Sequence, residues 1–151
     1  MARAKAVSPF SPRRGSGQRG ELKERAFVAF EPSPMAKPRA KNFETFGMAP
    51  VAAALVRHER GSVIGAVCGG VLVNRIHSLV DQISSAVFEE RLYGSKPLVT
   101  VTIFQWDVRM ATNVILPNGN RALGTRASAD VYDRVVEKDA SWYDRAFVVD
   151  E

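Results

Sequence analysis

The sequence predicts an α+β fold in which antiparallel strands form a central sheet flanked by helices. Three observations lead to this class: short apolar runs typical of strands, turn residues between neighbouring runs, and two segments with helical spacing. After a short first strand, the predicted order is strand, strand, helix, strand, strand, helix, strand. At 151 residues, the chain is long enough for one domain with a single hydrophobic core.

The first predicted elements are a short strand and a hairpin. Arg25–Glu31 alternates well enough for a strand, and the three prolines of the next stretch, PSPMAKPRAK, predict an extended loop. Gly47–Val56 and Val63–Val73 are predicted strands, and the polar, glycine-containing segment His58–Ser62 joins them.

The second hairpin strand is rich in glycine and holds the only cysteine of the chain. Gly65, Gly69 and Gly70 would let another backbone or a ligand approach closely. Cys68 lies in an apolar run, so we expect it to be a small buried hydrophobe. A single cysteine excludes an intrachain disulfide and a thiolate metal site.

Asn74 is predicted to be the N-cap of the helix that follows the hairpin. The helix shows one apolar stripe at helical spacing, formed by Ile76, Leu79, Val80, Ile83 and Val87. Two central strands are predicted next, at Leu98–Gln105 and Val108–Ile115, followed by a turn at Pro117–Asn120. A second helix is expected to begin near Ser128, and Arg145–Val149 is predicted to be the last strand.

The central motif reads FQWDVRMATNV, followed by ILPNG and NRALGT. It resembles the extracytoplasmic Cache (PAS-like, double-Cache type) sensor domains of bacterial histidine kinases and methyl-accepting chemotaxis proteins, in which F-x-x-D-x-R-x-A-T-N-V and G-x-R-A-x-G-T recur. The resemblance extends over most of residues 21–151, through GMAPVAAALVRHERGSVIGAVCGGVLVNRIHSLVDQI, RALGTRASADVYDRVV and WYDRAFVVD. It implies a non-catalytic module of a transmembrane signalling receptor that binds a small molecule and works without a cofactor.

The sequence departs from the family pattern in several places. Trp106 stands where a small residue usually precedes the Asp, and its ring could alter or fill a nearby pocket. The family continues beyond its A-F-V-V strand, and it begins with a membrane helix and a long helix. We therefore expect a domain truncated at both ends, with its C-terminal strands missing. A homodimer is expected in the parent receptor.

Three residues are the candidate ligand contacts. Because side chains alternate along a strand, Asp107, Arg109 and Asn113 are predicted to share one face. Arg109 and Asn113 would then line a pocket for a carboxylate or another anionic metabolite. The alternative is that Asp107 and Arg109 form a solvated cross-strand pair. Arg145, beside Trp142 and Tyr143, is the third candidate.

Other motifs give no support for catalysis. His58-Glu59 lies in a turn, not on the helix that a phosphoacceptor histidine needs, and His77 has no partner at metal-ligand spacing. The glycines between residues 65 and 70 do not have dinucleotide-site spacing. No nucleophile, base and orienting group come together, so the sequence does not predict an enzyme, although the parent protein could be a histidine kinase.

The basic residues are concentrated at the N-terminus. Residues 1–41 contain ten Lys and Arg against three Glu, a balance of +7, whereas the other 110 residues contain eleven basic and thirteen acidic residues, a balance of −2. Residues 1–20 are predicted to be a disordered basic tail, followed by a partial Cache domain at residues 21–151. A basic-tailed nucleic-acid-binding protein and a non-functional truncated product are the alternatives to a sensor fragment.

A nucleic-acid partner is not expected, because the basic residues of the tail lack the interleaved series of aromatic residues that single-strand binders use. No window reaches the length of roughly 18 apolar residues that a membrane span requires. The N-terminus also lacks the apolar core of a secretion signal. The family lies outside the cell membrane, but this chain as written is expected to be cytoplasmic.

Overall fold

The computed structural model describes residues 16–88, 92–93, 96–97 and 99–149. Its helices are α1 (Ser16–Ala26), α2 (His77–Phe88) and α3 (Ala129–Tyr132), which continues as the π-helical turn η1 (Asp133–Glu137). Its strands are β1 (Val28–Ala29), β2 (Phe43–Glu44), β3 (Val51–Arg57), β4 (Val63–Gly70), β5 (Leu92–Tyr93), β6 (Lys96–Pro97), β7 (Thr102–Gln105) and β8 (Val108–Thr112). The predicted α+β class with antiparallel pairing is confirmed.

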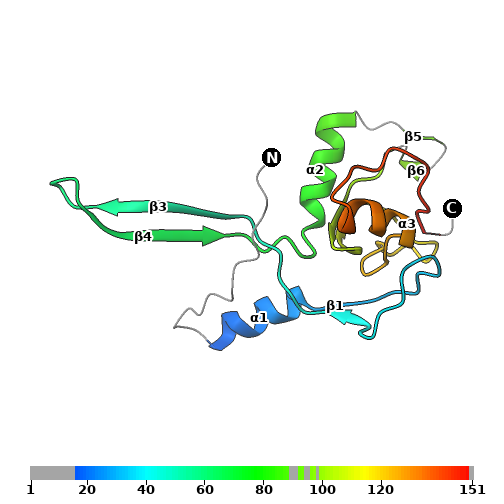
Figure 1. The fold of residues 1–151 in the computed structure, drawn as a ribbon, viewed down its shortest axis with the longest axis horizontal. Helices are drawn as coiled ribbons and strands as arrows, with labels where there is room; N and C mark the ends of the chain where they lie inside the picture. Colours follow the sequence, from blue (N-terminus) through cyan, green and yellow to red (C-terminus); the bar gives the residue numbers. More distant parts are fainter. Residues whose placement is uncertain (1–15, 89–91, 94–95, 98, 150–151) are drawn as a thin grey trace.

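Neighbouring strands pair antiparallel in four separate two-stranded sheets within the described part of the chain: β1 with β2, β3 with β4, β5 with β6, and β7 with β8. The structure therefore differs from the single central sheet that we expected. The difference arises because the β3–β4 hairpin stands apart from the β7–β8 hairpin. Figure 1 shows it projecting away from the body that contains α2 and α3.

β8 is the centre of the body. β7 lies along one of its edges, and the segment 121–127 follows the other through bridges at Val108 and Ile115. All five residues of β8 are buried, including Arg109, which was predicted to share one face with Asp107 and Asn113. The hydrophobic core lies against this strand and is formed by Val28, Val108 and Met110, with Phe30, Met48 and Leu123 packed around them.

The segment after the Pro117–Asn120 turn explains much of the G-x-R-A-x-G-T motif. Gly124 has a positive φ of 81°, and a Cβ there would lie 2.1 Å from the carbonyl oxygen of Ala29. Only glycine therefore fits between β1 and β8. The buried Thr125 donates a side-chain hydrogen bond to the carbonyl oxygen of Ala122 (2.8 Å).

The predicted hairpin at residues 47–73 is confirmed, with β3 and β4 joined by a turn at His58–Ser62. The expected environment of its residues is not found. Cys68 is exposed, and a Cβ added at Gly65 or Gly69 would meet no atom within 4 Å. Of the three glycines of β4, Gly70 alone has a close neighbour, because a Cβ there would lie 2.9 Å from the carbonyl oxygen of Pro50. The hairpin has no cover from the rest of the described chain.

Asn74 does not cap α2, which begins at His77. Its side chain is fully buried at the base of the β3–β4 hairpin instead. The amide oxygen accepts from the Met48 backbone N–H (2.8 Å), and the amide nitrogen donates to the carbonyl oxygens of Ala26 (3.2 Å) and Phe46 (3.1 Å). Three backbone groups from two distant segments outweigh the local capping role that sequence spacing suggested.

Three further expectations need correction. α1 begins at Ser16, so residues 16–20 are helical and not disordered, whereas residues 1–15 lie outside the described part. Arg145–Val149 belongs to no strand, and Val149 lies in a turn with a positive φ of 53°. In the apolar stripe of α2, Val80 is fully buried, but Leu79, Ile83 and Val87 are 36%, 39% and 63% exposed.

Candidate ligand-binding site

A pocket of about 260 Å³ opens between the β7–β8 hairpin, α3 and the C-terminal segment. Its walls are mostly apolar, with three hydroxyl groups and one charged side chain. The residues that line it are Thr100, Thr102, Phe104, Arg109, Ala127, Ser128, Val131, Ala146, Phe147 and Val148.

Arg109 is the charged residue of this pocket. Its backbone is held on β8 by hydrogen bonds with Gly124 (3.0 Å) and Thr125 (2.9 Å). Phe104 is its cross-strand neighbour on β7, and the guanidinium lies 5.3 Å from the centre of the phenyl ring. This cation–π contact and the backbone ladder orient the side chain toward the pocket.

Two of the three guanidinium nitrogens of Arg109 are buried without a polar partner in the described part of the chain. Only 4% of the residue is exposed, and Nε and Nη1 have no hydrogen-bond partner among the described residues. Desolvation by burial lowers the pKa of Arg109 below its usual value. The group nevertheless stays charged at physiological pH, because arginine starts from a very high pKa. An unpaired buried cation in a pocket is a donor available to an anion.

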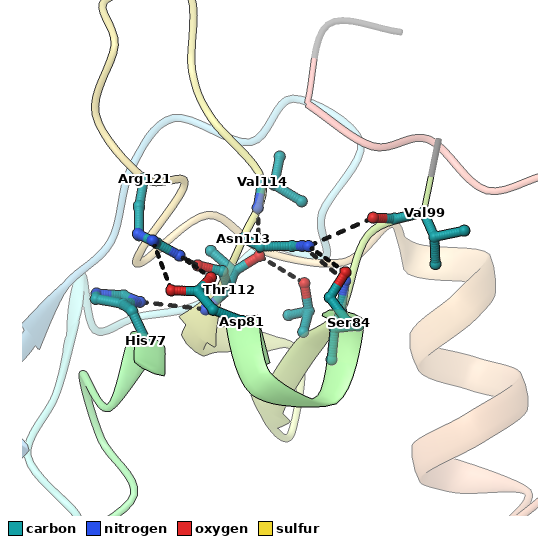
Figure 2. Close-up of polar contacts among 10 residues, drawn as sticks. His77, Asp81, Ser84, Val99, Thr112, Asn113, Val114 and Arg121 are labelled. Carbon is teal, nitrogen blue, oxygen red and sulfur yellow. Dashed lines mark hydrogen bonds and ion pairs between the residues drawn. The ribbon is translucent and has the colours of Figure 1, made fainter. Parts of the chain in front are cut away.

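Asn113, the second predicted contact, lies just beyond β8 and has its amide engaged elsewhere (Figure 2). Its Oδ1 accepts from the backbone N–H of Val101 (2.7 Å), and its Nδ2 donates to Ser84 Oγ (3.3 Å) and to the carbonyl oxygen of Val99 (3.4 Å). Asn113 does not line the pocket with Arg109. It ties β8 to α2 and to the segment that leads into β7.

Arg145, the third candidate, is exposed and precedes the pocket-lining residues Ala146, Phe147 and Val148. Its backbone N–H donates to the carboxylate of Asp144 (2.7 Å). The structure therefore brings Arg109 and the Arg145 segment to the same pocket, although the Arg145 side chain is not part of its wall.

Sequence reasoning missed the ion pair that fastens α2 to β8 (Figure 2). Arg121 makes a bidentate pair with Asp81, with Nη1–Oδ1 at 2.8 Å and Nη2–Oδ2 at 2.9 Å, and Nη1 also donates to the carbonyl oxygen of Thr112 (2.8 Å). Forty residues separate the partners, so no local spacing signals the pair. The recurring R-A-x-G-T motif was the only hint that Arg121 has a fixed role.

His77 lies beside this ion pair at the start of α2. Its Nδ1 accepts from the backbone N–H of Thr112 (3.4 Å), as Figure 2 shows. Burial lowers the pKa of His77 below 6.5, and the nearby positive charge of Arg121 acts in the same direction. The imidazole is therefore held as a neutral acceptor. In the described residues, no group of three His, Cys, Asp or Glu side chains could hold a metal ion.

Asp107 does not form the solvated pair with Arg109 that was the alternative interpretation. Its side chain is fully buried and lies between two other guanidinium groups. Arg126 contacts Oδ2 through Nε (2.9 Å) and Nη2 (2.7 Å). Arg39 Nη2 lies 2.8 Å from Oδ1, a charge contact without hydrogen-bond alignment. Asp107 therefore anchors the 33–39 loop to the turn between β7 and β8.

Trp106 does not fill the pocket. It occupies the turn between β7 and β8 with a positive φ of 59°, and 61% of its surface is exposed. The indole is not part of the pocket wall. The bulky residue at this position is accommodated because its side chain points into solvent.

Residues 71–151 match the family model described as single Cache domain 3, which covers more than half of the chain. The chain therefore belongs to the single Cache domain 3 family. The resemblance to Cache sensors is confirmed, but the matched family model is of the single type and not of the double-Cache type that we expected. Cache domains are sensory modules of receptors, bind small molecules and lie outside the cytoplasm. No curated protein and no solved structure matches the chain. In the part that the structure describes, no helix has the length and apolarity to cross a bilayer.

Proposed function

We propose that this chain is the ligand-sensing part of a bacterial transmembrane signalling receptor, a histidine kinase or a chemoreceptor, and that it binds a small carboxylate through Arg109. The observation that carries this proposal is the buried guanidinium of Arg109, whose Nε and Nη1 have no protein partner among the described residues. A cation is costly to bury without a partner, so a site that keeps one is suited to an anionic ligand.

The dimensions of the pocket restrict the ligand. Its volume of about 260 Å³ lies below the range of roughly 300–1,000 Å³ that is usual for drug-sized ligands. Apart from Arg109, much of the lining is apolar and includes Val131, Phe147 and Val148. Thr100 and Ser128, which carry hydroxyl groups, also line the pocket. A carboxylate with a short apolar body matches both the charge and the lining.

In this proposal, Arg145 and Asn113 have supporting roles. Arg145 lies on the C-terminal segment at the pocket and would add positive charge near its mouth, which attracts an anion. Asn113 acts as a positioning residue, because its amide connects β8 to Ser84 of α2. Neither residue needs to touch the carboxylate for the pocket to work.

The signalling step that we propose is a population shift. The pocket is lined by β7 and β8 on one side and by α3 and the C-terminal segment on the other. A ligand that contacts both sides stabilises the arrangement in which they are closest. Thr112 of β8 contacts Arg121, and Asn113, the next residue, contacts Ser84 of α2, so a change in β8 reaches that helix. Only differential affinity for the two arrangements can shift their balance.

We further propose that the domain comprises residues 21–151, beyond the matched region. The segment before residue 71 supplies Val28 to the core and Arg39 to Asp107. Ser33 Oγ accepts from the backbone N–H of Arg126 (2.9 Å). These contacts support one folded unit that includes the N-terminal loop.

A thermal-shift screen of the full chain against short mono- and dicarboxylates tests the proposal. Ligand at about 100 times its Kd should stabilise the protein by about 2.7 kcal/mol and raise Tm accordingly. Arg109→Met should abolish the shift, whereas Arg57→Met, at the far end of β3, should preserve it. A folded wild-type sample that responds to no carboxylate, or an Arg109→Met variant that responds like wild type, would overturn the assignment.

A further inference from the structure

The face of the β7–β8 hairpin that lines the pocket carries a second polar group besides Arg109. Thr102 pairs with Thr112 and Phe104 pairs with Arg109, and the register shifts between these two pairs. Cross-strand partners share a face, and so do residues two apart along β7, so all four residues lie on the same face. The register shift is what brings Arg109 and Thr112, three residues apart, to one side. Thr102, Phe104 and Arg109 line the pocket, whereas Thr112 is fully buried.

The hydroxyl groups of Thr102 and Thr112 are hydrogen-bonded to each other, with 2.7 Å between the two Oγ1 atoms. A hydroxyl has one hydrogen and two lone pairs, so only one of the two residues is the donor in this bond. The direction decides what Thr102 presents to a ligand. If Thr102 donates, only a lone pair faces the pocket. If Thr102 accepts, its own O–H is left to point into the pocket as a donor.

The burial of Thr112 determines the direction of this bond. Its Oγ1 accepts from the backbone N–H of Val114 (3.1 Å), and among the described residues Thr102 Oγ1 is its one other partner. A buried O–H without an acceptor is costly, so the hydrogen of the fully buried Thr112 points to Thr102. Thr102 is only partly buried, and its own hydrogen can be satisfied in the pocket. The chain of donors therefore runs from Val114 through Thr112 to Thr102 and ends in the pocket.

Thr112 is well fixed for this role. Its backbone N–H donates to His77 Nδ1 (3.4 Å), and its carbonyl oxygen accepts from Arg121 Nη1 (2.8 Å), as Figure 2 shows. A β-branched side chain has few rotamers once its backbone is held. The Thr112 hydroxyl is therefore oriented by the fold and not by the ligand.

The spacing of the two pocket donors sets where the ligand meets Thr102. The guanidinium of Arg109 lies over the ring of Phe104, and Thr102 is two residues from Phe104 along β7, a distance of about 7 Å between Cα atoms. A carboxylate held by Arg109 thus meets Thr102 with an atom several bonds away, and not with its own two oxygens.

We propose that Thr102 determines ligand specificity in the Arg109 pocket: its O–H, directed by Thr112, donates to an oxygen acceptor at the far end of a short carboxylate. This inference rests on the proposed function and narrows it from short carboxylates in general to those with a remote oxygen acceptor. Thr112 is the positioning residue. An apolar isostere of the same shape leaves the Thr102 donor unpaired, which is the strongest basis for rejecting a ligand of matching size.

Calorimetric titration of the full chain with matched pairs of acids tests the inference. Levulinate has a ketone near its far end, and isocaproate has a methyl group in place of that ketone oxygen; the pair one carbon longer extends the reach. Wild type should bind the ketone acid of at least one pair about ten-fold more tightly. Thr102→Val should bind both members of that pair equally, and Thr102→Ser should keep the preference. The matched control Thr45→Val, exposed and outside the pocket, should behave as wild type does.

Variants of Thr112 test the positioning role. Thr112→Val should reduce the preference for the ketone acid and leave the affinity for isocaproate unchanged, whereas Thr112→Ser should restore the preference. A merely structural residue would change the affinity for both acids alike.

Two results would contradict the inference and leave the proposed function intact. One is equal affinity of wild type for both members of both pairs, with Arg109→Met still abolishing binding. The other is tighter binding of the acid that has an amino group in place of the ketone oxygen, since it would mean that Thr102 presents an acceptor. Failure of every carboxylate to bind folded wild type would remove the proposed function and this inference together.

Discussion

Arg109 illustrates at the residue scale how a binding group costs stability. Only 4% of the residue is exposed, and two of its guanidinium nitrogens lack partners among the described residues. In the proposed function, the ligand supplies the missing acceptor. The unliganded domain therefore carries an uncompensated desolvation cost at this position.

Replacing Arg109 with methionine should consequently stabilise the unliganded protein while it removes carboxylate binding. Apolar replacement of buried charges is often neutral or stabilising by about 1–4 kcal/mol, and methionine can keep its contact with Phe104. Urea unfolding of wild type and Arg109→Met measures the difference. Marked destabilisation would show that the guanidinium is a structural element and not a ligand contact.

Asp107 is a second buried charge, but, unlike Arg109, it has partners of the opposite charge. Its carboxylate lies between Arg126 and Arg39, whose side chains are only 9% and 26% exposed. Asp107→Ala should destabilise the protein by about 3–5 kcal/mol, because it leaves buried guanidinium charge without a partner. Glu59→Ala in the exposed turn between β3 and β4 is the control and should change the free energy of unfolding by less than about 0.5 kcal/mol. Similar unfolding midpoints for the two variants would contradict the anchoring role.

His77 makes stability depend on pH. Burial, assisted by the charge of Arg121, lowers its pKa below the value of 6.5 that an unperturbed histidine has. Below this pH the unfolded chain binds a proton that the folded chain resists, so stability falls as pH drops through 6.5 toward the folded pKa. Above this pH, the contribution of His77 is constant and fully present.

We therefore expect His77→Gln to lose less stability than wild type between about pH 7.5 and pH 5.5, since glutamine keeps an acceptor but does not titrate. Denaturant unfolding at the two pH values measures the difference. The control His58→Gln, in the exposed turn between β3 and β4, should lose as much stability between the two pH values as wild type does. Equal pH dependence in His77→Gln and wild type would remove His77 from this role.

At the scale of elements, the attachment of α2 to β8 depends on a few polar contacts. Among residues 77–87 of the helix, whose burial the structure describes, Val80 is the one fully buried apolar residue, so Asn113, His77 and the Arg121–Asp81 pair carry much of the alignment. A helix held mainly by polar contacts can change position without disrupting a large hydrophobic interface. This property suits an element that responds to a ligand on the other side of β8.

Asn113→Ala should lower the free energy of unfolding by about 1–3 kcal/mol, because the Val101 N–H loses its acceptor in a partly buried site. Carboxylate affinity of the variant that remains folded should stay within a few-fold of wild type. Calorimetric titration beside urea unfolding separates the two effects, and Asn120→Ala in the exposed turn is the control. A large loss of affinity with unchanged stability would identify Asn113 as a ligand contact.

Local patterns in the sequence predicted these elements better than their environment. The hairpins at residues 51–70 and 102–112 and the helices after residues 74 and 128 lie where periodicity and turn residues indicated. Burial was predicted less well, because it depends on which segments meet in space. The apolar run around Cys68 and Gly65 is typical of a core strand, yet the β3–β4 hairpin stands apart from the body. Asn74 has the spacing of a cap, and its three long-range partners carry no local signal.

In the candidate site, too, local patterns predicted the residues better than their long-range contacts. Alternation on a strand singled out Arg109 and Asn113 together, but the chain changes course after β8, so only Arg109 reaches the pocket. The partners of Asp107 could not be predicted, since Arg39 lies in a proline-containing loop far away in sequence. The recurring Cache motif contains Asp107, Arg109, Asn113 and Arg121. Their separate contacts became visible only when distant segments were placed beside β8.

At the scale of the whole molecule, the charge distribution is less separated than the sequence suggested. Residues 1–41 hold a balance of +7, but two of their basic residues neutralise acidic groups of the body. Lys37 contacts Asp133 and Glu137, and Arg39 contacts Asp107. The hydrogen bonds and negative charges of Asp133 and Glu137 raise the pKa of Lys37 above its usual value. Part of the basic charge therefore serves the fold and is not available for a nucleic-acid partner.

Whole-molecule behaviour should also reveal how unevenly stability is distributed over the chain. By itself, a two-stranded hairpin opens easily, whereas β8 is enclosed by β7 and the segment 121–127. Backbone amides of the exposed strands β3 and β4 should therefore exchange with deuterium at least ten-fold faster than those of β8, a difference of about 1.4 kcal/mol in the free energy of opening. Hydrogen exchange read by mass spectrometry resolves the two regions. Equal protection of the two hairpins would mean that the β3–β4 hairpin is stable although the described chain does not cover it.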